Sequence, residues 1–131
     1  MTGESNLSVL LRSMKPSLNK GDYVFCALMP PHVIPKEAVC FFKEQEAITV
    51  IIRKEIADEL QLNYSFIAAW ISLTVHSSLS AVGLTAAIST ALAKNNISCN
   101  VVAAYYHDHL FVDKKDAQEA MTILTELSNL H

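Results

Sequence analysis

The apolar and polar positions of residues 66–94 predict a strand followed by a helix. Phe66–Val75 is apolar at first and alternates with polar residues from Trp70 onward, a period typical of a half-buried strand. After a polar loop, the apolar residues of Val82–Lys94 recur at helical spacing. Asn95 and Asn96 follow, and they are suited to end this helix.

The segment after residue 96 predicts a hairpin and a second helix. Ile97–Tyr106 is rich in β-branched and aromatic residues, and Leu110–Val112 returns across a turn at His107-Asp108-His109. Asp113 is suited to be the N-cap of a final helix, one face of which is apolar. The residues of that face are Ala117, Ala120, Met121, Leu124 and Leu127.

Residues 1–65 repeat part of this order. The pattern predicts a strand at 22–29, a hairpin of 38–42 with 47–52, a short helix at 54–60, and a separate helix at 6–13 that packs against the sheet. Three prolines between Pro30 and Pro35 exclude a long helix where the second copy has a full one. We therefore expect α+β architecture with two copies of one unit, residues 1–65 and 66–131, which share a core because each is too small to bury its own.

The composition is that of a folded chain with a small-molecule or protein partner. Of the 131 residues, 51% are hydrophobic and 18% are charged, and only 3 Gly and 4 Pro occur, which excludes a disordered or low-complexity chain. A net charge of −3 with 10 Lys and Arg provides no basic surface for nucleic acid or for an anionic membrane.

The sequence predicts neither a membrane span nor an export signal. The weakly charged stretch between Glu59 and Asp108 contains many polar residues, and its longest apolar run, Phe66–Ile71, is far shorter than the about 20 residues that a span needs. Glu4 stands where a signal peptide carries positive charge. The three cysteines lie in apolar runs without CxxC spacing, as reduced packing residues do. We therefore expect a cytoplasmic protein.

Several short motifs of the second half occur in one order. They are the strand ISLTV at Ile71–Val75, the polar loop His76–Ser80, Gly83-Leu84 at the helix start, and Asn96-Ile97 before the next strand. Together they resemble the ACT domain family, the amino-acid-sensing modules of regulated enzymes of amino-acid metabolism. Residues 1–65 are similar to that family only in pattern, as in small stand-alone bacterial proteins of two ACT-like units and in tandem-ACT arginine sensors.

This resemblance implies a ferredoxin-like fold of tandem βαββαβ units with antiparallel sheets. It also implies that units or subunits pair side by side and hold an amino acid, or a similar small zwitterion, at the seam. The first loop and the second strand of the unit would form that site. The matching residues of this chain are His76, Ser77, Ser78, Leu79, Val82, Gly83, Asn100 and Val101.

The polar residues of the implied site have two interpretations. The hydroxyl groups of the loop and the free N–H groups of the first helical turn suit a carboxylate, whereas Ser78 or Ser80 could instead only cap the helix. Gly83 lets a ligand or another backbone approach closely. Asn100 could bind an ammonium or amide group, or it could face solvent at a sheet edge.

Neither a metal site, a cofactor site nor a catalytic site is expected. The side chains of His107, Asp108 and His109 diverge at a hairpin tip, so we expect no metal there. Tyr105-Tyr106 before the turn is expected to pack across the strands. His76 and Ser77 are adjacent but lack an orienting acid and an oxyanion loop.

Three kinds of function are compatible with the sequence. The first is a regulatory module that binds an amino acid between its units or at a homodimer seam, since the weakly charged second half has more apolar surface than a small domain normally hides. The second is a structural or interaction protein whose units only dimerise or dock a partner; a dry, apolar seam would favour it. The third, an enzyme with His76 or His107 as general base, needs a second titratable group in a cleft, and the sequence indicates none.

Overall fold

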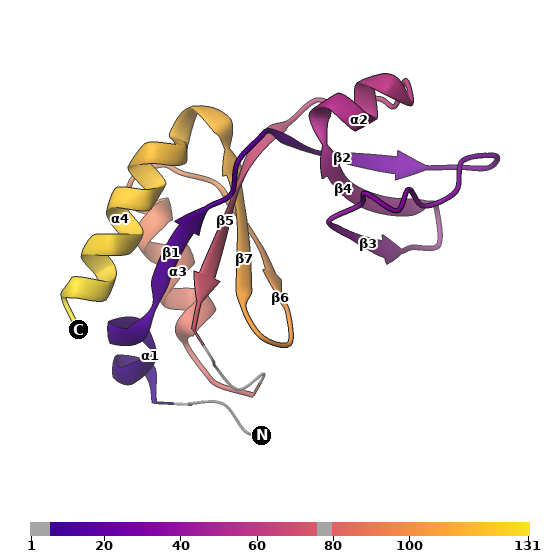
Figure 1. The fold of residues 1–131 in the computed structure, drawn as a ribbon. Helices are drawn as coiled ribbons and strands as arrows, with labels where there is room; N and C mark the ends of the chain where they lie inside the picture. The colour runs from indigo at the N-terminus through magenta and orange to yellow at the C-terminus, as the bar shows by residue number, and fades with distance from the viewer. Residues whose placement is uncertain (1–5, 76–79) are drawn as a thin grey trace. The chain divides into compact units, whose positions relative to one another are not determined.

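The computed structural model describes residues 6–75 and 80–131, which form two compact units (Figure 1). Unit 1 is built from the described residues of 1–19 and 69–131, and unit 2 from residues 20–68. Unit 2 is therefore an insertion between two chain segments that fold together. The division into repeats at residues 1–65 and 66–131 stays a prediction about sequence units.

The described residues of unit 1 form four strands and three α-helices. The strands lie in the order β1-β5-β7-β6, with β1 antiparallel to β5 and β6 antiparallel to β7. They are β1 (Lys15–Leu18), β5 (Ile67–Thr74, from Ala69 onward), β6 (Cys99–Ala103) and β7 (Asp108–Asp113). The helices are α1 (Leu7–Ser13), α3 (Leu84–Ala93) and α4 (Ala117–Asn129).

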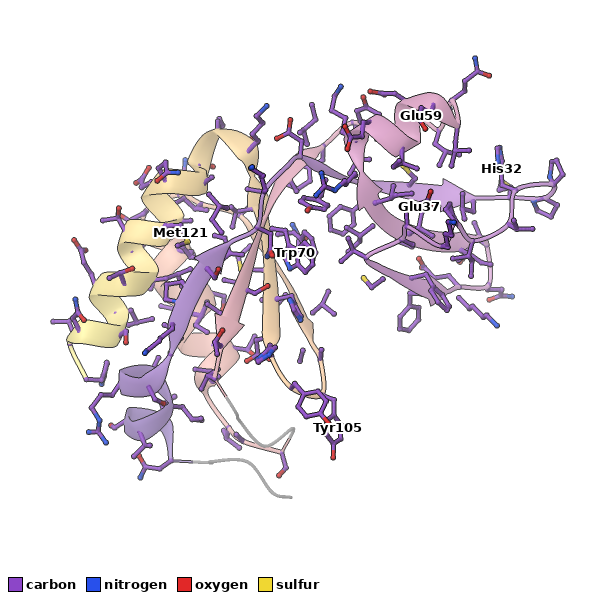
Figure 2. The ribbon with its side chains drawn as sticks, in the orientation of Figure 1. His32, Glu37, Glu59, Trp70, Tyr105 and Met121 are labelled. Carbon is purple, nitrogen blue, oxygen red and sulfur yellow. The ribbon has the colours of Figure 1, made fainter. Side chains whose placement is uncertain are left out.

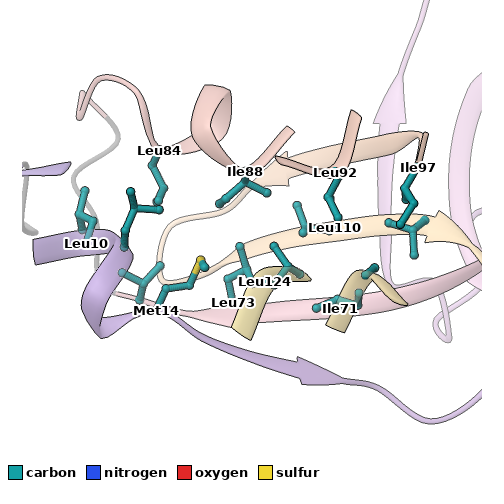
Figure 3. Packing of buried hydrophobic residues seen from close by; sticks show 14 of the residues in the cluster. Leu10, Met14, Ile71, Leu73, Leu84, Ile88, Leu92, Ile97, Leu110 and Leu124 are labelled. Carbon is teal, nitrogen blue, oxygen red and sulfur yellow. The ribbon is translucent and has the colours of Figure 1, made fainter. Parts of the chain in front are cut away.

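The core of unit 1 lies between its helices and one face of its strands. Alternation along β5 turns Ala69, Ile71 and Leu73 into this core, and all three are buried. Ile88 of α3 and Leu124 of α4 pack onto the same cluster (Figure 3). The apolar face predicted for the last helix is confirmed, because each of its five residues belongs to this core or packs against it.

The N-terminal segment supplies both a helix and a strand to unit 1. The Asn6 side chain caps α1 by accepting a hydrogen bond from the Val9 N–H at 3.1 Å. Leu10 and Leu11 of α1 are buried in the core, and α1 also contacts α3 and α4. The sequence did not predict β1, because this strand is short and mostly exposed and contains Pro16, which only an edge strand tolerates.

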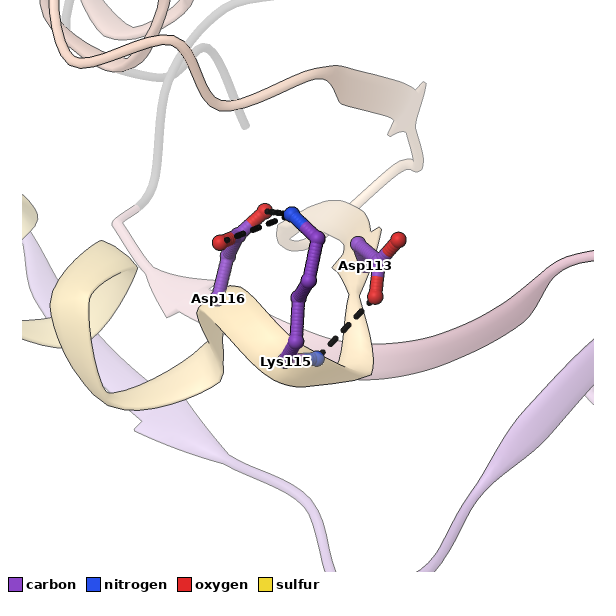
Figure 4. Close-up of polar contacts among 3 residues, drawn as sticks. All are labelled: Asp113, Lys115 and Asp116. Carbon is purple, nitrogen blue, oxygen red and sulfur yellow. Dashed lines mark hydrogen bonds and ion pairs between the residues drawn. The ribbon is translucent and has the colours of Figure 1, made fainter.

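With β1 included, unit 1 has the strands and helices of a ferredoxin-like fold, although β1 precedes the other strands in the chain. The order β5-α3-β6-β7-α4 was predicted, and β1 takes the place of the sixth element at the outer edge of β5. The last helix is preceded by the 3₁₀ turn Lys114–Asp116. Asp113, predicted to be the N-cap of the helix itself, caps this turn, since its Oδ1 accepts a hydrogen bond from the Lys115 N–H at 3.0 Å (Figure 4), and the N-cap position of α4 is Asp116.

Unit 2 follows the same plan with fewer elements. Its strands lie in the order β3-β4-β2-β5, and the beginning of β5 pairs with β2 through Val24 and Ile67. The elements are β2 (Tyr23–Leu28), β3 (Cys40–Lys43), β4 (Ile48–Arg53) and α2 (Lys54–Glu59). As predicted, residues 29–39 form turns and extended chain rather than a helix. The α+β, ferredoxin-like fold class is confirmed for the chain as a whole.

The predicted position of the β6–β7 turn is wrong. Ala103 pairs with Asp108, so the turn is residues 104–107, and the Ala104 N–H donates to the His107 carbonyl oxygen at 3.0 Å. Tyr105 and Tyr106 therefore lie in the turn, 63% and 67% exposed, and contact each other instead of packing across strands (Figure 2). The aromatic character of this segment suggested a longer strand than the backbone forms.

Candidate functional site

The chain at the beginning of α3 contains two of the predicted site residues, Val82 and Gly83. Gly83 has φ +102°, a conformation that glycine adopts more readily than any other residue. A Cβ atom at this position would lie 3.2 Å from Cδ2 of Leu7, so α1 approaches the glycine closely. Gly83 is the N-cap of α3 and has no side chain to cap it, and the helical hydrogen bonding begins with the Ala87 N–H donating to the Gly83 carbonyl at 2.8 Å. Val82, just before it, is 84% exposed.

The two predicted residues of β6 lie on opposite faces of the sheet. Val101 pairs with Leu110 and packs against the helix-covered core. Asn100 pairs with Phe111, and its side-chain amide donates to the Phe111 carbonyl at 3.3 Å. The Val101 side chain therefore lies on the face of the sheet that the helices cover, where Gly83 also lies. The Asn100 side chain lies on the opposite face. The remaining predicted residues, His76, Ser77, Ser78 and Leu79, lie outside the described residues.

One edge of unit 1 combines α3 with β6. Among the described strands, β6 pairs with β7 alone, so its outer backbone edge is open. The helix α3 contacts β6, and its exposed positions Thr85, Ala86 and Thr90 carry no charge. We call α3 together with β6 the α3–β6 edge.

A groove of about 580 Å³ runs between α3 and α4 in unit 1. Ala86, Ala87 and Ala91 form its α3 side, while Ile123 and Leu127 form its α4 side. Its charged lining residues within the described chain are Lys94 and Glu126. The sequence did not indicate this groove, because its depth comes from small side chains on α3.

A polar and aromatic cluster lies on the sheet face of unit 1 opposite the helices. The Trp70 indole N–H donates to Nδ1 of His109 at 3.0 Å, and Oγ of Ser72 lies 3.2 Å from the same nitrogen. The Asn19 amide donates to Oγ of Ser72 at 2.9 Å and to the Trp70 carbonyl at 3.2 Å. Phe111, which is buried, stacks on Trp70 with ring centroids 6.1 Å apart.

The hydrogen bond from Trp70 fixes the protonation of His109. An indole N–H can only donate, so Nδ1 of His109 must carry the lone pair and its proton must sit on Nε2. Burial lowers the pKa of His109 below its ordinary value, and the nearby His107 lowers it further, against the opposing charge of Asp108. The alternation of β5 predicts that Trp70 and Ser72 share a face, but no sequence pattern indicates their partner across the sheet.

The cysteines are placed for packing rather than for reaction. Cys26 is buried, while Cys40 and Cys99 are half-buried, and all three are free thiols. Burial raises the pKa of each thiol, that of Cys99 to about 11. These thiols stay protonated near neutral pH, and the protonated form is a poor nucleophile and a poor metal ligand.

Residues 6–75 and 80–131 contain neither a metal-binding cluster nor a helix that could span a membrane. In this part of the chain no group of three or more His, Cys, Asp or Glu side chains is arranged to hold a metal ion. The rings of His107 and His109 are 6.4 Å apart at their centroids and nearly perpendicular. Every helix described is too short or too polar to span a bilayer.

Comparison with known proteins matches both halves of the chain to one family. Residues 2–69 match one model of the ACT domain, and residues 65–126 match another. The chain belongs to the ACT domain family. ACT domains are typically ligand-binding regulatory modules, and these matches indicate no catalytic family.

Solved structures share the fold of this chain. The chain is 44% identical to a Vibrio cholerae protein of unknown function, described as a possible transport protein, with a TM-score of 0.82 over 93% of this chain and 95% of that one. An Agrobacterium tumefaciens protein is 17% identical, with a TM-score of 0.67 over 88% and 89% of the two chains. The ligand-free regulatory subunit of aspartate kinase from Thermus thermophilus is 10% identical, with a TM-score of 0.62 over 86% and 95%, which shows a shared fold. No protein with a curated function matches the ACT chain.

Proposed function

We propose that this ACT protein is a regulatory module, and not an enzyme, that binds an amino acid or a similar small zwitterion at the α3–β6 edge. The ligand would contact loop 76–80, Val82 and Gly83 at the start of α3, and Val101 on β6. It would reach Asn100, whose side chain lies on the other face of the sheet, around the open edge of β6. Family membership supports the ligand class, because ACT domains are typically ligand-binding regulatory modules.

The observation that carries the proposal is the geometry at Gly83. Gly83, with a positive φ, is the N-cap of α3 and brings no side chain to the helix start, and we assign the N–H groups of the first turn to an anionic group of the ligand. The chain there is close-packed, because a side chain at residue 83 would meet Leu7. The carboxylate of an amino acid fits these donors in charge and in size.

We further propose that the chain acts as a cytoplasmic homodimer whose copies meet at the α3–β6 edge, without nucleic acid or membrane as a partner. The open backbone of β6 and the absence of charged residues from α3 support such pairing, since a charged edge would oppose it. A ligand that touches both copies would stabilise one arrangement of the dimer and so change how a further protein binds.

A thermal-shift screen of the twenty amino acids tests the proposal. A ligand at about 100 times its dissociation constant adds about 2.7 kcal/mol to the free energy of unfolding, which raises Tm by several degrees in a chain of this size. We expect a selective shift with one amino acid or a few related ones. If no amino acid shifts Tm, the alternative is favoured, an interaction protein whose ACT units only dimerise or dock a partner.

Two matched glycine variants separate loss of binding from loss of stability. Gly83→Ala and Gly21→Ala both place a Cβ at a φ slightly above +100°, in unit 1 and in unit 2 respectively. The nearest side-chain atoms are then Cδ2 of Leu7 at 3.2 Å and Nη1 of Arg53 at 3.3 Å. We expect both variants to lose similar stability, and Gly83→Ala alone to lose the ligand-induced shift. If both variants bind the ligand equally well, the binding site does not include Gly83.

A further inference from the structure

One flank of α2 in unit 2 has no helix beside it. In unit 1 the last helix, α4, packs against α3. Unit 2, all of whose residues are described, has α2 as its one helix, and the irregular connection 29–39 stands where a first helix would come in the chain. The flank of α2 therefore lacks the helical neighbour that its counterpart has.

A groove of about 430 Å³ lies between this flank and the connection. Its apolar lining includes Leu28 of β2, Ile56 of α2, Leu60 at the C-cap of α2, and Val33 of the connection. Val33 is 81% exposed and Leu60 is 39% exposed, so apolar surface remains open in this unit. Burial of these side chains would release free energy in proportion to the area covered.

The charged groups of the groove have a single sign. Glu37 of the connection and Glu59 of α2 line it together with His32, and neither Lys nor Arg is among its lining residues (Figure 2). Neither glutamate forms an ion pair with a described residue, whereas Asp58, next in sequence to Glu59, pairs with Lys54 at 3.0 Å. An occupant with basic groups at its margin would therefore gain two ion pairs without breaking any.

We propose that this groove binds an amphipathic helix of a partner protein, one that has a narrow apolar stripe flanked by Lys or Arg. The partner helix would lie along α2 and pack against it, as α3 packs against α4 in unit 1. The stripe of α3 itself, Leu84, Ile88 and Leu92, shows the spacing that covers a sheet of this kind. This surface is separate from the amino-acid site, and either proposal can fail without the other.

Titration of the full chain with a synthetic helix tests this inference. The probe is a peptide with the sequence of α3, Leu84–Ala93, in which Lys replaces the polar residues on both sides of the apolar stripe. Amide chemical shifts should change at Leu28, Ile56 and Leu60 and along the connection. In the double variant Glu37→Lys/Glu59→Lys the peptide should bind roughly tenfold more weakly, and a peptide with Glu in place of each Lys should bind that variant better than the natural chain.

Two packing variants complete the test. Leu60→Asp should abolish binding, while Phe42→Asp, at a 71% exposed position of β3 outside the groove, should leave it unchanged. The charge-reversal variants keep the test valid if Leu60→Asp does not fold. Two results would overturn the inference directly: no change of amide chemical shifts in the groove at millimolar peptide, or equal binding of the peptide by the natural and charge-reversed chains. A concentration-dependent dimer that Leu60→Asp alone dissociates would also overturn it, because the occupant would then be a second copy of the chain.

Discussion

Leu10→Ala is expected to destabilise unit 1 by about 3 kcal/mol. Leu10 lies in α1, yet its side chain is 0% exposed and packs in one cluster with residues of β5, β7 and α4. The substitution removes three carbon atoms, and at about 0.8 kcal/mol for each buried methylene the lost transfer free energy is about 2.4 kcal/mol. The remaining cavity raises the cost of such changes to about 2.7–5 kcal/mol. We expect the lower part of this range because Leu7, on the same helix, is 36% exposed and can partly fill the space.

Urea unfolding together with amide hydrogen exchange measures this effect and locates it. The free energy of unfolding should fall by about 3 kcal/mol at an unchanged m-value. Exchange should accelerate in β7 and α4, although these elements follow residue 10 by about a hundred positions. Leu130→Ala is the matched control, since Leu130 is 81% exposed and its truncation should cost less than about 0.5 kcal/mol.

Either of two results would contradict the packing of α1 into the core of unit 1. A loss below about 1 kcal/mol for Leu10→Ala would mean that α1 does not pack into the core as described. Faster exchange confined to β2 and β4 would mean that the N-terminal segment folds with unit 2.

Three further predictions follow from single contacts. Protonation of His109 must break the hydrogen bond from the Trp70 indole. Because burial lowers the pKa of His109 below that of the unfolded chain, the free energy of unfolding should fall as pH drops below about 6.5. The fluorescence of Trp70, the single tryptophan, should follow this titration and become independent of pH in His109→Gln. Cys99, with a pKa of about 11, should react with a thiol reagent at pH 8 far more slowly in the folded chain than in urea, and equal rates would contradict its burial. Asp113→Ala should lower the free energy of unfolding by about 1 kcal/mol through loss of the cap, while Asp113→Asn should keep most of it.

Much of the fold could be predicted because its elements have clear periods. The alternation from Trp70 onward gave β5, and the stripe that contains Leu124 gave α4. The start of α3 was predicted two residues early, since apolar spacing does not reveal that Gly83 has a positive φ. The strand β1 has too few residues for any period, and its role depends on pairing with β5, some fifty residues away.

The candidate site could be predicted less completely than the fold. The resemblance in sequence indicated Gly83 and β6; Gly83 begins α3 beside Leu7 of α1, and β6 is an edge strand of unit 1. The opposite direction of the Asn100 side chain depends on the register of β6 with β7, which in turn depends on the true position of the turn at 104–107. The groove beside α2 exists because no helix forms between Pro30 and Pro35. Only the three-dimensional structure shows which apolar side chains are exposed to solvent as a result.

The most direct test of the central claim is a map of amide chemical shifts as each of the twenty amino acids is added to the chain. We expect one amino acid to change the amides at the start of α3, Gly83 among them, and those of Asn100 and Val101 on β6. If no amino acid changes these amides, or if the changes are confined to unit 2, the chain does not bind an amino acid at the α3–β6 edge and the proposed regulatory function is wrong.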